Sequence, residues 1–138
     1  MNSMKRRGAE NAEDVHNAIS EQVIGAAIQV HRFLGPGLLE SVYAACLARE
    51  FHLQGIQFEQ EQPILVGYKG IKIDNGYRVD FVVEQLAILE IKAADRLHPI
   101  HTAQLLTYLR LTDKKLGLLI NLNVPVLRDG IRRVVNNL

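Results

Sequence analysis

Two neighbouring apolar segments, residues 77–83 and 86–92, constrain this chain more than any other feature, because charged residues interrupt both of them. Asp80 stands within the first segment, and Glu90 and Lys92 stand within the second. The apolar composition predicts two buried β-strands with a short connection. Burying a charge is costly unless the charge is paired or bound to a metal ion, so these three side chains predict a functional site.

The register of the two strands decides whether the three side chains meet. Glu90 and Lys92 are two residues apart and therefore lie on the same face of their strand. In an antiparallel pair, paired residue numbers that add up to 170 place Asp80 opposite Glu90, with the Cβ atoms roughly 5 Å apart. A total of 169 sends Glu90 to the other face. A shared site thus requires an odd number of connecting residues, and the alternative is a structural Glu–Lys pair beside an unrelated Asp.

Facing carboxylates repel one another unless a cation lies between them, and carboxylate oxygens are hard ligands that suit Mg²⁺ or Mn²⁺. Such an ion lowers the pKa of a bound water and polarises a phosphoryl oxygen. The ammonium group of Lys92 would orient that water or stabilise the charge that builds up on a phosphate. The pattern therefore indicates metal-assisted hydrolysis of a phosphodiester.

The rest of the chain predicts a single α/β domain with a mixed sheet. Residues 1–14 are polar without a period and predict a disordered tail, which leaves residues 15–138 as the domain. Ser20 is expected to cap the first helix, Gly55 to end the second and Pro99 to start the third. The patterns predict helices over 20–34, 38–52 and 99–111, strands over 56–66, 77–83, 86–92, 116–121 and 131–135, and a hairpin turn at Asn75-Gly76.

Composition limits the functional classes. Of the 138 residues, 48% are hydrophobic and 22% are charged, which is typical of a globular protein. The single cysteine, Cys46, excludes an internal disulfide and a thiolate zinc site. No apolar run approaches the ~20 residues of a membrane span, and no secretory signal is recognisable, so a cytoplasmic protein without a membrane partner is expected.

The formal net charge of +1 hides an uneven distribution, with −4 over residues 1–91 and +5 over residues 92–138. This asymmetry suits a site in which carboxylates hold a cation while basic residues face an anion. An ordinary mixed surface is the alternative interpretation.

The order of the elements and the charged residues resemble the PD-(D/E)XK nuclease superfamily, whose core runs helix, three strands, helix, strand. Asp80 matches its first acid, and Glu90-Ile91-Lys92 matches its E-x-K element. Val79 stands where the superfamily has a proline, which takes no part in the chemistry. The resemblance implies that Asp80 and Glu90 bind the metal ion together with the Ile91 carbonyl, and that Lys92 activates water.

On the third expected helix, Gln104 and Tyr108 look like the Gln-x-x-x-Tyr element of the superfamily's exonuclease branch. On a helical wheel His101, Gln104 and Tyr108 fall within about 60° of each other. They would support the site or hold a phosphate, and a solvated polar face is the alternative. His31 is a further candidate because that branch has histidines upstream of the first acid, although a hydrogen-bonded core histidine is the other interpretation.

Residues 37–43, Gly37-Leu-Leu-Glu40-Ser-Val-Tyr43, spell the signature of the GxxExxY protein family, and this resemblance covers about residues 20–136. Some nucleases of the superfamily carry a helix-borne Glu that reaches the metal ion, and Glu40 would match it. The alternative is a first-turn Glu favoured by the helix dipole. The resemblance implies a restriction-endonuclease-like α/β core with a mixed sheet flanked by helices, two of them N-terminal.

The sequence thus predicts a Mg²⁺-dependent or Mn²⁺-dependent nuclease that acts on DNA or RNA. A non-catalytic nucleic-acid-binding or assembly subunit that retains the fold is the alternative, because nothing in the chain looks like a separate DNA-reading module. A homodimer or a protein partner stays open in either case.

Overall fold

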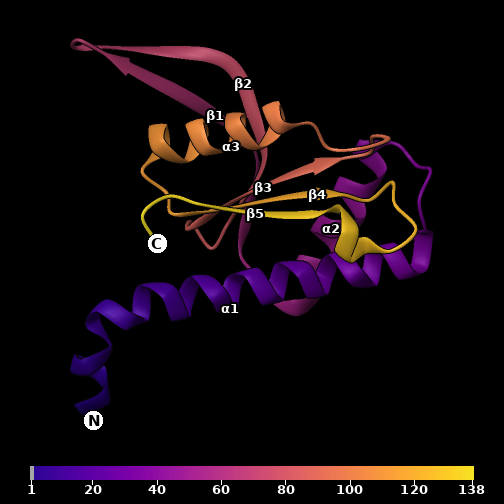
Figure 1. Ribbon diagram of the computed structural model, residues 1–138, viewed down its shortest axis with the longest axis horizontal. Coiled ribbons are helices and arrows are strands. Elements are labelled where there is room, and N and C mark those ends of the chain that lie inside the picture. Colours follow the sequence, from indigo (N-terminus) through magenta and orange to yellow (C-terminus); the bar gives the residue numbers. More distant parts are fainter. Residues whose placement is uncertain (1) are drawn as a thin grey trace.

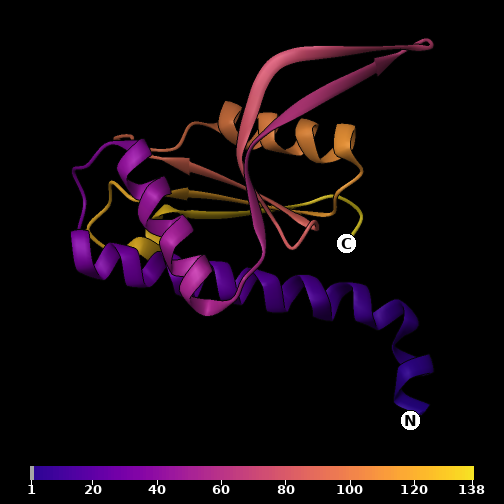
Figure 2. The same ribbon diagram turned by 180° about the vertical axis from the view of Figure 1, so that it is seen from behind.

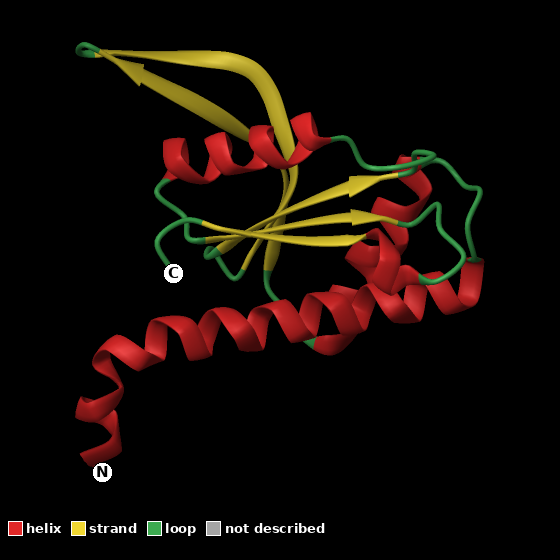
Figure 3. Cartoon of the chain, in the orientation of Figure 1, coloured by secondary structure: helices red, strands yellow, loops and turns green. Residues whose placement is uncertain are grey.

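The computed structural model describes residues 2–138, with side chains described from residue 12 onward. Three α-helices, a 3₁₀ turn and five strands form a mixed α/β fold, as expected (Figures 1 and 3). In chain order the elements are α1 (Asn2–Leu34), α2 (Glu40–Gln54), β1 (Phe58–Tyr68), β2 (Ile71–Val83), β3 (Ala87–Lys92), α3 (Pro99–Thr112), β4 (Leu116–Asn121), η1 (Leu127–Gly130) and β5 (Ile131–Val135).

The sheet follows the order of the chain, from β1 at one edge to β5 at the other. β3 and β4 are parallel, and all other neighbours are antiparallel. Parallel neighbours need a crossover connection, which α3 provides. α3 lies on one face of the sheet, whereas α1 and α2 lie on the other (Figure 1). Each face of the sheet is therefore covered by helices.

Alternating side chains of β3 divide between the two cores. Leu89 and Ile91 pack in the core that includes α1 and α2. Ile88 packs in the core that includes α3. Because alternate residues of a strand share a face, Glu90 and Lys92 point to the side that α3 covers. The fold thus places the charged residues of β3 beneath α3.

The expected hairpin turn at Asn75-Gly76 is wrong. The turn that joins β1 to β2 lies at Lys69-Gly70, where both residues have positive φ. The register of β1 and β2 shifts by two residues between Pro63 and Leu65, and β2 carries the extra residues there. The Asn-Gly dipeptide therefore forms an irregularity inside β2, because the hairpin already closes earlier in the chain, at Lys69-Gly70. The outer part of the hairpin, residues 65–74, projects from the sheet as an arm (Figures 1 and 2).

α1 begins well before Ser20, so the expected cap at that residue is also wrong. Ser20 is 5% exposed inside the helix, and Ile19 and Val23 pack in the core beside it. Since this buried stripe continues towards His16, the helix continues with it. Of the expected tail, Met1 lies outside the described residues and residues 2–14 are helical, so the division at residue 14 stays a prediction.

Apart from the start of β2, at Ile71 instead of the expected Tyr77, the other expected boundaries lie within about two residues of those observed. Gly55 has φ +72 and ends α2, and Pro99 is the first residue of α3. Pro63 lies in the edge strand β1 beside the register shift, as suits a residue that lacks a backbone N–H. Cys46 is partly buried against the core of α1 and α2, as a small apolar side chain would be. In the described part of the chain no helix has the length and apolar character needed to span a membrane.

Candidate active site

The paired part of β2 and β3 ends just before Asp80 and Glu90. Paired residues have numbers that add up to 170, and the connection, residues 84–86, contains three residues. This register meets the condition for a shared site. Beyond the last pair, the backbone N–H of Asp80 donates to Oε1 of Glu90 at 3.0 Å. The N–H of Ile91 donates to Oδ2 of Asp80 at 2.7 Å, so each carboxylate is fixed by the main chain of the opposite strand.

Both carboxyl groups lie where ionisation is unfavourable. Glu90 is 4% exposed. Burial, with a contribution from the negative charge of Asp80, raises the pKa of Glu90 to about 7, although a hydrogen bond from Tyr77 opposes the shift. Burial also raises the pKa of Asp80, and the charges of Glu61 and Glu40 add to that effect. A cation between the two carboxylates would relieve this cost.

The donor set fits a hydrated magnesium or manganese ion. In residues 12–138 the ion pair between Arg78 and Asp74 is the only one, so neither Asp80 nor Glu90 has a basic partner in direct contact. Among the described residues, no three Asp, Glu, His or Cys side chains gather as a complete metal cage. Mg²⁺ usually takes one or two carboxylates and keeps several waters. Two fixed carboxylates beside the Ile91 backbone meet that requirement.

Lys92 extends the site towards the start of α3. Its positive charge lowers the pKa of Glu90. It also contributes, after partial burial, to a lowered pKa of His101. The ammonium group is therefore within electrostatic reach of both side chains. The Nδ1 atom of His101 accepts the backbone N–H of His98 at 3.3 Å, so this histidine caps the first turn of α3.

Two stacked tyrosines connect α3 with the carboxylate pair. The rings of Tyr77 and Tyr108 stack with centroids 4.9 Å apart and planes inclined by 28°. The hydroxyl of Tyr77 donates to Oε2 of Glu90 at 2.6 Å. Burial raises the pKa of Tyr108, and the charge of Glu90 adds to it, whereas a hydrogen bond from Gln104 opposes it. Gln104 itself is exposed, and Tyr108 is linked to Glu90 through Tyr77.

Tyr43, in the first turn of α2, bonds the loop that precedes the helix. The fully buried Tyr43 donates its hydroxyl to the Gly35 carbonyl at 2.6 Å. The same oxygen accepts the N–H of Leu38 at 3.2 Å. Gly37 has φ +102 between these contacts, a conformation that favours glycine. The Gly and Tyr of the sequence signature thus hold the loop that starts α2.

Glu40 and Asn121 hold the segment that follows β3. Oε2 of the exposed Glu40, the first residue of α2, accepts the N–H of Ala93 at 3.3 Å. The buried Asn121 accepts the N–H of Ala94 at 3.0 Å and donates to its carbonyl at 2.9 Å. These contacts fix the chain directly after Lys92. A metal-binding role for Glu40 stays a prediction.

The comparison with protein families decides what this arrangement belongs to. A model described as the PD-(D/E)XK nuclease superfamily matches residues 17–134. The chain belongs to that superfamily. No curated protein and no solved structure matches the chain significantly. Membership agrees with the observed order of helices and strands, whereas assignment to the GxxExxY family stays a prediction.

In this superfamily member, His31 makes its hydrogen bond away from the carboxylate pair. Its Nε2 atom donates to the Val124 carbonyl at 2.7 Å, which ties α1 to the loop after β4. This bond agrees with a hydrogen-bonded core histidine, and a site role for His31 stays a prediction. Sequence reasoning overlooked Tyr77 and Asn121. Asn121 ends an apolar strand and could have been noticed, but only the folded chain brings Tyr77 to Glu90.

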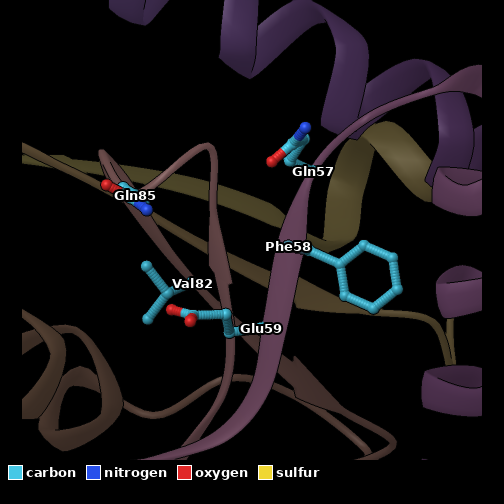
Figure 4. Close-up of a pocket in the computed structure, with 5 residues that line it drawn as sticks. All are labelled: Gln57, Phe58, Glu59, Val82 and Gln85. Carbon is cyan, nitrogen blue, oxygen red and sulfur yellow. The ribbon is translucent and has the colours of Figure 1, made fainter.

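A shallow hollow lies elsewhere on the sheet (Figure 4). Its lining comes from the start of β1, the end of β2 and the following turn. The lining residues are Gln57, Phe58, Glu59, Val82 and Gln85. None of the predicted site residues contributes to it, and β3 carries Glu90 and Lys92 at its opposite end. The superfamily's charged residues therefore mark the active-site candidate, and the hollow does not.

Proposed function

We propose that this superfamily member is a metal-dependent nuclease that hydrolyses phosphodiester bonds of DNA or RNA. The observation that carries the proposal is the pair of Asp80 and Glu90, two carboxylates fixed by one another's strands and lacking, within residues 12–138, a basic partner in contact. Buried carboxyl groups with raised pKa values cost folding free energy, and such groups concentrate at functional sites. Lys92 beside the pair would supply a positive charge that stabilises the phosphate during hydrolysis.

Asp80 and Glu90, with the Ile91 carbonyl, would hold Mg²⁺ or Mn²⁺. When bound, the ion would supply an acidified water and polarise a phosphate oxygen. The main-chain bonds to both carboxylates hold them in place before the ion arrives, which lowers the ordering cost of binding. Glu40, whose carboxylate reaches the end of β3, would add negative charge at the edge of this centre.

Lys92 would act on the reacting groups rather than on the ion. Its side chain shares the face of Glu90, so its ammonium group would lie beside a phosphate bound at the carboxylates. There it would donate a hydrogen bond to the attacking water or to the phosphate oxygen on which charge increases. Gln104, exposed on α3, would contact the phosphate, and Tyr108 would support Glu90 through Tyr77. His101, at the first turn of α3, would border the same site.

Purified protein incubated with labelled single-stranded and double-stranded DNA and RNA tests the proposal. Cleavage is expected with Mg²⁺ or Mn²⁺ and not with EDTA, and Glu90→Gln should remove it. This variant keeps an acceptor for the N–H of Asp80 while losing the negative charge. Binding without cleavage on every substrate would instead favour the non-catalytic subunit. The absence of both would contradict either function.

A further inference from the structure

The backbone just before Tyr77 is an ordered elbow in β2. The carboxylate of Asp74 accepts bonds from both terminal nitrogens of Arg78, at 3.1 and 3.2 Å. It also accepts the N–H of Gly76 at 2.9 Å. The side chain of Asn75 accepts the N–H of Tyr77 at 2.8 Å. Because residues 74–78 are bonded to one another, the direction in which Tyr77 leaves the strand is fixed locally.

Tyr77 has two contacts on the inner side of this elbow. Its ring stacks on Tyr108 of α3, and its hydroxyl donates to Oε2 of Glu90 at 2.6 Å. The other oxygen of Glu90, Oε1, accepts the N–H of Asp80. One donor on each oxygen fixes the plane of the carboxylate, and a carboxylate with about four lone-pair sites still has two available for a cation.

We infer that Tyr77 is a positioning residue that orients the Glu90 carboxylate for binding of a divalent cation. The inference rests on the proposed function, because it assigns the cation to the pair of Asp80 and Glu90. Without the hydroxyl, Oε2 of a buried carboxylate has no donor, and the group can rotate away from the cation. Removing the hydrogen-bond partner of a metal ligand typically weakens metal binding by about 10-fold to 100-fold.

Tyr77→Phe tests this inference, because it removes the hydroxyl and keeps the ring that stacks on Tyr108. Tyr68→Phe is the matched control, since it removes a hydroxyl from a tyrosine that lies exposed on the arm, outside the proposed site. Mn²⁺ titration of the folded proteins, followed by electron paramagnetic resonance of the free ion, measures the affinity. Tyr77→Phe should weaken binding about 10-fold or more, and Tyr68→Phe should leave it within about twofold of wild type.

A second measurement separates orientation from a general loss of structure. In EDTA, the melting temperature of Tyr77→Phe should fall moderately, because a buried carboxylate oxygen loses its donor while the ring packing is kept. A large fall in melting temperature with unchanged Mn²⁺ affinity would make Tyr77 a structural residue and overturn the inference. In the Glu90→Gln background, Tyr77→Phe should have no further effect on the residual affinity, and an undiminished effect there would overturn the link to Glu90.

The outcome for wild type distinguishes this inference from the proposed function. If wild type binds Mn²⁺ and Tyr77→Phe binds it equally well, the positioning role is wrong while the metal centre stands. If wild type binds no Mn²⁺ while remaining folded, the proposed metal centre is wrong and the role of Tyr77 falls with it.

Discussion

Asp80 and Glu90 exchange bonds across the end of a strand pair. Each carboxylate accepts a main-chain N–H from the other strand, with N–O distances of 2.7 and 3.0 Å. With ordinary ladder bonds the two backbones would pair with each other at this point, and the carboxylates would accept no main-chain N–H from the opposite strand. Here the ladder ends at Phe81 and Leu89 and the carboxylates take over the pairing, which leaves two fixed acidic groups that have no basic partner in contact among the side chains the structure describes.

Asp80→Asn should abolish the stabilisation by Mg²⁺ or Mn²⁺ that the wild-type protein shows. Binding to the folded state alone raises the melting temperature, and the increase depends on the ion concentration. Asn keeps an acceptor for the N–H of Ile91 and removes the repulsion with Glu90, so its stability in EDTA should change little. Thermal melts with and without metal check this expectation. The exposed Asp129 provides a control, and Asp129→Asn should respond to metal as wild type does.

The free energy of unfolding without metal should fall as the pH rises from about 5 to about 8. The pKa of Glu90 is raised from 4.5 to about 7, so between these values the folded protein holds a proton that the unfolded chain has released. Stability is therefore full below the unfolded value and is lost as the pH rises through the folded one, by about 1 to 3 kcal/mol. Urea denaturation in EDTA at several pH values measures the slope.

Glu90→Gln provides the reference for that slope, because it cannot ionise. The difference in stability between wild type and Glu90→Gln should change with pH in the stated direction. Equal slopes for the two proteins would show that Glu90 does not titrate in this range.

Local chemistry made part of this fold predictable. Pro99 and Gly55 mark helix boundaries because proline lacks an N–H and glycine accepts positive φ, and both properties act whatever the rest of the chain does. Asn75-Gly76 is as strong a turn signal, but the hairpin closes at Lys69-Gly70 and Asn75-Gly76 lies within β2. Competition between two possible turns depends on the pairing of whole strands, which no short pattern contains.

The candidate site divides in the same way. The sequence alone indicates Asp80, Glu90 and Lys92, because they are charged residues within apolar segments and burying an unpaired charge costs free energy. The sequence did not indicate that Tyr77 bonds Glu90. Tyr77 directly follows Asn75-Gly76, which predicted a turn, whereas in the structure this dipeptide lies inside β2. Contacts between α2 and the end of β3, such as Glu40 with Ala93, depend on packing between distant segments.

Tyr43→Phe should destabilise the protein by about 0.5 to 1.5 kcal/mol, because it removes the donor to the partly buried Gly35 carbonyl. The same hydroxyl also accepts the N–H of Leu38, so both ends of the loop lose a contact. Urea denaturation measures the loss. Tyr68 lies exposed on the arm, so Tyr68→Phe should have almost no effect. Equal stability of both variants would show that the Tyr43 hydroxyl does not stabilise the loop before α2.

Lys92→Ala separates an enzyme from a binding subunit. The proposed ammonium contact is made with the reacting water and phosphate, and interactions that exist mainly in the transition state change the rate without changing ground-state binding. The variant should therefore keep its stabilisation by Mn²⁺ and most of its nucleic-acid binding. Cleavage should fall by about 10²-fold or more, as on removal of one electrostatic stabiliser.

The control for this variant is Lys115→Ala, because Lys115 bonds the Asn137 carbonyl near the C-terminus and takes no part in the proposed site. It should cleave as wild type does, which excludes a general effect of removing one positive charge. If Lys92→Ala cleaves at the wild-type rate, Lys92 has another role and the activity arises at a different centre. If Lys92→Ala loses its response to Mn²⁺, the ammonium group is needed to organise the carboxylate pair itself. Rate and metal response measured on the same preparations thus assign Lys92 either to the chemical step or to the structure of the metal centre.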